Sequence, residues 1–212
     1  RMTLFKEMGL STEIQSAIEE LGFEQPTPVQ EQTIPFLLES TQDVVSLAQT
    51  GTGKTAAFGL PIIQQVDTAK KSIQALILSP TRELAMQIAN DLKNYSKNTA
   101  NFKSAVVYGG SDIRTQISEL SRGPQVVVGT PGRTLDLIKR GKLRVEEIRW
   151  VVLDEADEML SMGFKDDLDA ILENSPAEKQ TLLFSATMPK EIVAISKKYM
   201  KDIHEISVGK RN

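Results

Sequence analysis

One stretch of the sequence has the residue types and the spacing of a loop that binds phosphate groups. It reads Ala48-Gln49-Thr50-Gly51-Thr52-Gly53-Lys54-Thr55, which fits the pattern G-x-x-x-x-G-K-[ST] except for the alanine in first place. Glycines let main-chain N–H groups surround an anion, Lys54 can reach the outer phosphates of a nucleotide, and the Thr55 hydroxyl can ligate Mg²⁺. This phosphate loop (residues 48–55) predicts a nucleotide site; a glycine-rich turn with a surface lysine is the alternative.

A cluster of acidic residues, Asp154-Glu155-Ala156-Asp157, directly follows the apolar run 150–153. Mg²⁺ at a phosphate loop needs a carboxylate ligand besides the loop hydroxyl, and Asp154 is placed to supply it, partly through water. Glu155 is then the candidate general base that polarises a water molecule near the γ-phosphate. An acidic helix N-terminus stabilised by the helix dipole is the alternative. Together with Lys54, the cluster predicts a catalytic set of Lys54, Asp154 and Glu155.

Short apolar runs alternate with helical patterns along the chain, which predicts a parallel sheet covered by helices. The runs are residues 44–47, 75–78, 105–108, 126–128, 150–153 and 182–184, and a further strand is expected at 203–208. Amphipathic helices are expected at 11–21 and 82–98. Because such apolar strands are buried on both faces, we predict an α/β fold of three layers, with a mainly parallel central sheet flanked by helices.

The segments that follow these six runs are polar or rich in glycine. They are the phosphate loop, Pro80-Thr81-Arg82, Gly109-Gly110, Thr130-Pro131-Gly132-Arg133, the acidic cluster and Ser185-Ala186-Thr187. In open α/β sheets ligands bind at the carboxyl ends of the strands, where loops and helix N-termini bring free N–H groups together. All six segments are therefore predicted to lie at one edge of the sheet.

The composition restricts the chemistry and the partners that are open to the chain. Its 212 residues, 40% hydrophobic and 25% charged, predict one globular domain, expected to be monomeric. The absence of cysteine and the single histidine exclude disulfides, thiolate catalysis and cysteine-bound zinc. A formal net charge of −3 means that any grip on nucleic acid must be local. The sequence shows no secretory signal and no apolar run of roughly 20 residues. We therefore expect no membrane contact and a cytoplasmic location.

From Phe5 to about Val208, the chain closely resembles the N-terminal half of DEAD-box RNA helicases. The motifs that carry the resemblance are Asp154-Glu155-Ala156-Asp157, Ser185-Ala186-Thr187, Pro80-Thr81-Arg82-Glu83-Leu84-Ala85 and Thr130-Pro131-Gly132-Arg133. Residues 22–30, with Gly22-Phe23 and Pro26-Thr27-Pro28-Val29-Gln30, are similar to the Q motif of that family. The resemblance implies a RecA-like P-loop NTPase domain over residues 1–208, with 209–212 starting a linker to a second RecA-like domain absent from this chain.

The resemblance implies that the Q motif binds adenine. Gln30 would hydrogen-bond the edge of the base, Phe5 would stack on the ring, and Thr27 would brace the phosphate loop beside Gly22 and Phe23. A neutral amide suits this role because it can both donate to and accept from adenine. From the residues alone, Phe5 would be a core aromatic and Gln30 a solvent-facing helix residue.

The resemblance also assigns roles to the remaining strand-end segments. Ser185 and Thr187 would be linked through Asp157 to the nucleotide site and would relay the ATP state, whereas an internally satisfied hydroxyl pair is the alternative. The residues expected along the RNA backbone are Thr81, Arg82, Gly109, Gly110, Thr130, Gly132 and Arg133. Their glycines allow close approach, and their N–H groups and arginines can bind phosphates.

No aromatic residue interrupts these RNA loops, which predicts a grip on the sugar-phosphate backbone that ignores base sequence. Taken singly, Arg82 could pair with an acid instead, and Thr-Pro-Gly is ordinary turn chemistry. RNA rather than DNA is an inference from the family resemblance alone.

The expected function is that of an ATP-dependent RNA helicase, in which Mg²⁺-dependent hydrolysis of ATP is coupled to RNA binding and local unwinding. This chain alone is expected to bind adenine nucleotide, hold RNA weakly and not unwind. Its missing partner domain would supply arginine fingers, which in GTPases are worth roughly 10³–10⁵ in rate. A nucleotide-dependent switch is one alternative, disfavoured by the intact Lys54, Glu155 and Thr187. A small-molecule kinase is another, for which the motifs leave no room for a lid or an acceptor pocket.

Overall fold

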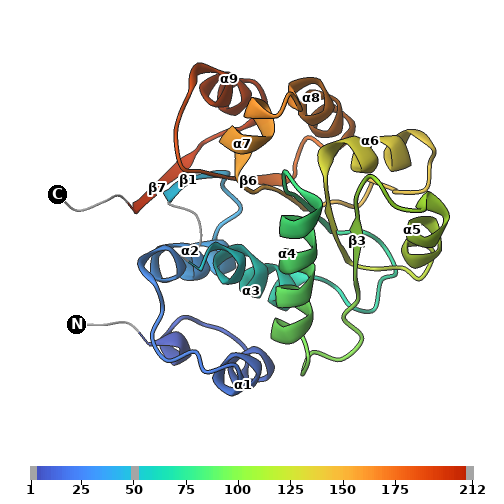
Figure 1. The fold of residues 1–212 in the computed structure, drawn as a ribbon. Helices are drawn as coiled ribbons and strands as arrows, with labels where there is room; N and C mark the ends of the chain where they lie inside the picture. Colours follow the sequence, from blue (N-terminus) through green and yellow to red (C-terminus); the bar gives the residue numbers. More distant parts are fainter. Residues whose placement is uncertain (1–3, 49–52, 209–212) are drawn as a thin grey trace.

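Seven short strands hydrogen-bond side by side, all in parallel, in the computed structural model, which describes residues 4–48 and 53–208 (Figure 1). They are β1 (Val44–Ala48), β2 (Ala75–Leu78), β3 (Ser104–Val107), β4 (Val126–Gly129), β5 (Trp150–Leu153), β6 (Gln180–Ser185) and β7 (His204–Val208). The predicted runs thus become strands, including the last one, and the sheet is wholly parallel in the described part of the chain.

Four of the helices begin where a side chain accepts one of the first free N–H groups. The helices are α1 (Thr12–Glu20), α2 (Pro28–Glu39), α3 (Lys54–Gln65), α4 (Arg82–Tyr95), α5 (Ile113–Leu120), α6 (Pro131–Lys139), α7 (Ala156–Ser161), α8 (Lys165–Asn174) and α9 (Lys190–Tyr199), after a 3-10 turn at Phe5–Glu7. Ser11, Thr27, Thr81 and Asp112 cap α1, α2, α4 and α5 in this way. The helices predicted at 11–21 and 82–98 are therefore present, the second ending three residues early.

The helices form two layers, one on each face of the sheet (Figure 1). Side chains alternate along each strand, so that Ala75 and Ile77 of β2 pack with α1–α4 while Leu76 and Leu78 pack with α5–α9. All four β2 residues are fully buried, as expected for a parallel strand covered on both faces. The predicted three-layer α/β fold is confirmed.

The strand order divides the carboxyl edge of the sheet into two halves. The order is β3-β4-β2-β5-β6-β1-β7. Ala48, the acidic cluster and Ser185 lie at the carboxyl ends of β1, β5 and β6, and these strands are neighbours. The three expected RNA loops follow β3, β4 and β2, which are also neighbours. The described parts of the six segments therefore share one edge, with the expected nucleotide motifs on one half and the expected RNA motifs on the other.

Buried glutamine side chains hold the main chain at both edges of the sheet. Gln74, Gln125 and Gln180 lie at the amino edge, and each is less than 5% exposed and bonded to main-chain groups of neighbouring loops. Gln30 and Gln116 do the same at the carboxyl edge. A buried amide suits this task because it satisfies a main-chain donor and an acceptor together without burying a charge.

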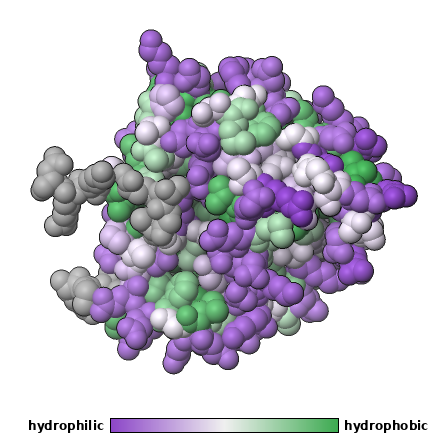
Figure 2. All heavy atoms as spheres, in the orientation of Figure 1, coloured by the Kyte–Doolittle hydropathy of each residue, from purple (hydrophilic) through white to green (hydrophobic). Residues whose placement is uncertain are grey.

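The exterior is mostly hydrophilic on the face drawn in Figure 2, where the apolar areas are small and separate. The large apolar side chains that are exposed, Leu21, Met86, Met162 and Met188, come from different elements. No helix in the described ranges is long and apolar enough to cross a membrane.

Candidate functional site

The described part of the phosphate loop joins β1 to the start of α3. Gln49, Thr50, Gly51 and Thr52 lie outside the described residues. Ala48 is buried at the end of β1, and Gly53 has a φ of 80° and precedes α3, whose first residue is Lys54. A Cβ atom at Gly53 would lie 2.5 Å from Nε2 of Gln30 and 3.0 Å from the Thr27 hydroxyl. Glycine is therefore required at position 53 for both its backbone conformation and its neighbours.

Lys54 and Asp154 form a buried ion pair between the two motifs. The Lys54 Nζ lies 3.1 Å from Oδ1 of Asp154, and each side chain is only 7% exposed. Burial raises the pKa of the Asp154 carboxyl, an effect that the neighbouring Lys54 opposes. The pair shows how β1 and β5, separated by β6, bring the lysine and the carboxylate to one point.

The site fits a magnesium ion held together with a nucleotide. In the described residues, Oδ1 of Asp154 is buried and receives no conventional hydrogen bond beyond its contact with Lys54. The half-buried Thr55 lies in the first turn of α3, near Asp91; burial raises the pKa of the Asp91 carboxyl, and Thr55 opposes this shift. Asp154 and Thr55 would supply the one or two protein oxygens that Mg²⁺ usually takes, while phosphates and water complete its shell.

Glu155, the candidate base, is the residue that precedes α7 and has an unusual backbone conformation. Its φ of 52° and ψ of 51° are left-handed, which is uncommon for a residue other than glycine. Such backbone strain is concentrated at functional sites. Burial raises the pKa of its carboxyl; Lys54 opposes this shift, and the negative charge of Asp154 adds to it.

Asp157, Thr187 and Ser185 are joined in one chain of hydrogen bonds. The Thr187 hydroxyl and its main-chain N–H both donate to Oδ2 of Asp157, at 2.9 and 3.1 Å. The Ser185 hydroxyl donates to the Thr187 carbonyl at 2.6 Å. The expected connection between the ends of β5 and β6 is therefore present, while its role as a relay stays a prediction.

The Q-motif residues surround one hollow beside the phosphate loop. Gly22, Phe23, Thr27 and Gln30 line it, together with Glu24 and Gln25, and its volume is about 530 Å³. Gln30 is 4% exposed, so it is not the solvent-facing residue that its helix alone would suggest. Its Oε1 accepts the Thr27 N–H at 2.9 Å, and its Nε2 donates to the Gly53 carbonyl at 3.3 Å. Among the described residues, each of these bonds uses one of the two hydrogen-bonding positions of its amide atom.

Phe5 does not line the hollow that Gln30 lines. It is 7% exposed, packs on the Phe23 ring with 5.7 Å between centroids, and lines an adjacent hollow instead. Phe23 in turn contacts Tyr95 edge-on at 5.9 Å. Phe5 is thus the core aromatic expected from the residues alone, and its stacking on adenine stays a prediction.

The three expected RNA loops lie side by side on the other half of the edge. Thr81 caps α4, Gly109 and Gly110 are exposed after β3, and Thr130 donates its N–H to the Val107 carbonyl at 3.1 Å. A Cβ atom at Gly109 or Gly132 would meet nothing within 4 Å. The packing of the protein itself therefore does not require glycine at these two positions.

The expectation that the RNA loops contain no aromatic residue was wrong. β3 ends at Val107, so Tyr108 opens the Gly109–Gly110 loop instead of closing the strand. The Arg82 guanidinium lies over the Tyr108 ring, 4.7 Å from its centroid. An aromatic residue therefore belongs to the RNA loops, and Arg82 is placed by a cation–π contact and not by an acid.

Gln116 was not among the residues predicted for the site, although its position in the sequence marks it as unusual. Ile113, Gln116, Ile117 and Leu120 follow the spacing of the buried face of a helix, and Gln116 is the only polar member of that set. In the structure it is 5% exposed and bonds both Tyr108 and Arg133. A lone amide on an apolar helix face is what would have identified it.

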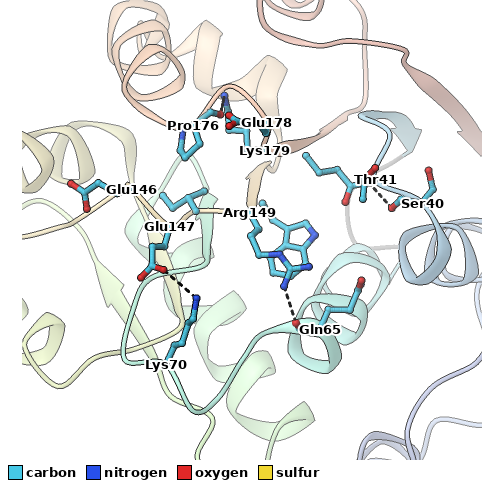
Figure 3. Close-up of a pocket in the computed structure, with 13 residues that line it drawn as sticks. Ser40, Thr41, Gln65, Lys70, Glu146, Glu147, Arg149, Pro176, Glu178 and Lys179 are labelled. Atoms are coloured by element: carbon cyan, nitrogen blue, oxygen red, sulfur yellow. Dashed lines mark hydrogen bonds and ion pairs between the residues drawn. The ribbon is translucent and has the colours of Figure 1, made fainter.

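A hollow of about 390 Å³ lies at the opposite edge of the sheet, beside the amino ends of β5 and β6 (Figure 3). Its polar groups are largely paired within the protein. Lys70 contacts Glu147 at 3.3 Å, and Arg149 donates to the Gln65 carbonyl while stacking on Trp150. These paired groups of the hollow are therefore not available to bind a ligand.

A parallel α/β sheet with a phosphate loop and buried carboxylates at its carboxyl edge defines a nucleotide-binding domain of the P-loop class. The family model described as DEAD/DEAH box helicase matches residues 27–195, and the chain belongs to this family.

Two relatives and one solved structure place the chain more closely. It is 51% identical over 207 residues to the DEAD-box ATP-dependent RNA helicase CshA of Geobacillus kaustophilus, covering 98% of this chain and 44% of the relative. It is 53% identical over 199 residues to the ATP-dependent RNA helicase CshA of Listeria monocytogenes, covering 94% and 38%. A DEAD box protein from Methanococcus jannaschii superimposes with a TM-score of 0.94 at 45% identity, over 99% of this chain and 57% of that one. The chain thus spans less than half the length of the two curated relatives and has the RecA-like fold expected from its motifs.

Proposed function

We propose that this chain is the ATP-binding domain of an ATP-dependent RNA helicase, which couples hydrolysis of ATP to RNA binding and local duplex unwinding. One observation carries the proposal: the sheet order puts nucleotide motifs after β5-β6-β1 and RNA motifs after β3-β4-β2, on one continuous edge. The two curated relatives, which align over nearly all of this chain, are ATP-dependent RNA helicases by name. Because β5 of the nucleotide half and β2 of the RNA half are neighbouring strands, a structural change on binding or hydrolysis of ATP would be passed directly from one half to the other.

In this proposal the nucleotide lies between the Q motif and the acidic cluster. Gln30 reads the edge of the adenine with its free donor and acceptor, and Lys54 leaves Asp154 to contact the outer phosphates. Asp154 and the Thr55 hydroxyl would hold Mg²⁺, which neutralises charge on the phosphates when bound. Glu155 takes a proton from the attacking water, whose oxygen bonds to the γ-phosphorus while the bond from that phosphorus to the bridging oxygen of ADP breaks, so that ADP and phosphate are released. Asp157 and Thr187 connect this site to the end of β6.

The RNA would lie across the other half of the edge with its backbone against the protein. Arg82 and Arg133 supply charge-assisted hydrogen bonds to phosphates, and the Thr81 and Thr130 segments begin helices whose N–H groups face the same side. A second RecA-like domain would close over this edge and supply the arginine fingers. The chain alone should then bind adenine nucleotide but not unwind a duplex.

The ATPase rate of the natural full-length protein, with and without single-stranded RNA, tests this proposal. Stimulation by RNA is the expected result. Nucleotide binding without hydrolysis would favour a switch module, and RNA-independent transfer of phosphate to a small molecule would favour a kinase. Either outcome contradicts the helicase.

Replacing Gln30 with Ala is expected to reduce the preference for ATP over GTP by roughly tenfold, because two hydrogen bonds of ordinary strength to adenine are lost. The measurement is the ratio of the two nucleotide affinities in the isolated chain. Gln74→Ala, which removes another buried glutamine at the far edge of the sheet, should leave the ratio unchanged. Equal binding of ATP and GTP by the wild type would contradict the Q-motif assignment.

Replacing Gly132 with Ala separates the needs of the fold from those of RNA. Gly132 lies in the first turn of α6, where a Cβ atom meets nothing, so alanine should stabilise the domain by up to about 1 kcal/mol. RNA affinity should fall, because the added methyl obstructs the close approach of a phosphate. Thermal unfolding and RNA titration measure the two effects. Unchanged RNA affinity would remove Gly132 from the RNA surface.

A further inference from the structure

Gln116 stands at the junction of the RNA loops, although no motif contains it. Its Oε1 accepts the Tyr108 N–H at 3.2 Å, and its Nε2 donates to the Tyr108 carbonyl at 3.0 Å. The same Oε1 accepts a hydrogen bond from Nη1 of Arg133 at 2.9 Å. Both acceptor positions of the amide oxygen are thus filled from two different loops.

Arg133 completes the junction from the other side. Its Nη2 donates to the Ser111 carbonyl at 3.1 Å, one residue beyond the glycine pair. In the described part of the chain it forms no ion pair: Asp112, which attracts it electrostatically, is bound to Arg114 at 2.9 Å. Arg133 is therefore held by an amide and a carbonyl, both neutral, and keeps its positive charge and further N–H donors for another partner.

The junction extends to the third RNA loop through Tyr108. The main chain of this residue is fixed by Gln116, and its ring lies under the Arg82 guanidinium, 4.7 Å away. Arg82, the Gly109–Gly110 turn and Arg133 thus depend on one buried side chain, which is 5% exposed. Gln116 itself has little surface left with which to touch a ligand.

We infer that Gln116 is the positioning residue of the RNA site: its neutral amide orients Arg133 and fixes the Gly109–Gly110 turn without neutralising the arginine charge. This inference rests on the proposed function, since it assigns the three loops to RNA. It explains why an amide stands on the apolar face of α5. A carboxylate could hold Arg133 but would cancel its charge and leave the Tyr108 carbonyl without a donor. An apolar side chain would hold neither loop.

Two substitutions test the inference in the natural full-length protein, with a non-hydrolysable ATP analogue, Mg²⁺ and a labelled oligouridylate as the RNA. Gln116→Met keeps the length of the side chain and removes the amide, and it should weaken RNA binding roughly tenfold. Gln116→Glu should hold Arg133 but remove its charge from the RNA. The salt dependence of RNA affinity should then become shallower by about 0.7 in log–log slope, the value of one phosphate contact on a single strand.

A matched control separates positioning from general loss of stability. Gln125 is 2% exposed and also bonds the main chain of neighbouring loops, but at the amino edge of the sheet. Gln125→Met should lower the melting temperature as much as Gln116→Met does and leave RNA affinity unchanged. The affinity for ATP should be the same in both variants.

A double-mutant cycle that combines Gln116→Met with Arg133→Ala tests whether Gln116 acts through Arg133. Because Gln116 acts partly through Arg133, the loss of RNA affinity in the double variant should be smaller than the sum of the two single losses. Additive losses, or RNA binding by Gln116→Met that equals that of Gln125→Met, would overturn the inference while leaving the helicase proposal in place. If the wild type bound no RNA at all, the proposed function would fail first, and the inference with it.

Discussion

Replacing Glu155 with Gln is expected to lower the rate of ATP hydrolysis by about 10²–10⁴-fold, the usual contribution of a positioned general base. Glutamine keeps the size of the side chain and its hydrogen-bonding reach but cannot take a proton from water. Binding of ATP should persist, because Gln30, Lys54 and Asp154 are untouched. The measurement is kcat for RNA-stimulated hydrolysis by the natural full-length protein, together with the affinity for ATP.

A neighbouring glutamate provides the control for this change. Glu158 lies on the same short helix, α7, but is exposed to solvent. Glu158→Gln removes the same charge from the same element and should leave kcat close to that of the wild type. If both variants lost activity equally, the general charge of the cluster would matter and not the position of Glu155.

The pH profile carries an independent signature of the same residue. A base works in its ionised form, and burial raises the pKa of Glu155 above its ordinary value, an effect that Lys54 opposes. Hydrolysis should therefore decline as the pH falls through this raised pKa, earlier than for a free glutamate. The residual activity of Glu155→Gln should have a weaker acidic limb.

Much of the fold follows from features that the sequence displays directly. Apolar runs such as 75–78 and 126–128 can only be buried on both faces, and they are. The carboxyl ends of parallel strands share an edge, so the segments at Thr81, Thr130 and Asp154 had to lie together once the strands were recognised. The need of a phosphate loop for a carboxylate ligand, and the place of Asp154 directly after a strand, also indicated that Lys54 and Asp154 serve one site.

What could not be predicted depends on contacts between residues far apart in the chain. The order of the strands sets which motif lies beside which, and periodicity carries no information about it. The burial of Gln30 depends on Gly53, 23 residues away. Tyr108 belongs to a loop because β3 ends one residue earlier than its apolar run. Gln116 was passed over because motif reasoning attends to strand ends and not to a polar residue within a helix face.

The ion pair between Lys54 and Asp154 has consequences for stability as well as for catalysis. Replacing Lys54 with Met is expected to abolish ATP hydrolysis and to destabilise the nucleotide-free chain by about 3–5 kcal/mol, because the Asp154 carboxylate is left buried without its partner. Chemical unfolding of the isolated chain measures the loss. Lys97→Met, which removes an exposed pair with Glu20 at 3.0 Å, should cost less than about 1 kcal/mol.

The pH dependence of this loss identifies its cause. The loss of Lys54 removes the largest effect that opposes burial, so the pKa of Asp154 rises further. A carboxyl whose folded-state pKa is raised loses stability as the pH rises through that value. The destabilisation should thus vanish below the unfolded pKa of about 3.9 and grow toward neutral pH. In the double variant with Asp154→Asn the buried charge is gone, so stability should return while hydrolysis does not. If Lys54→Met is as stable as the wild type at pH 7, or if the double variant is no more stable than the single one, the ion pair does not stabilise the nucleotide-free domain.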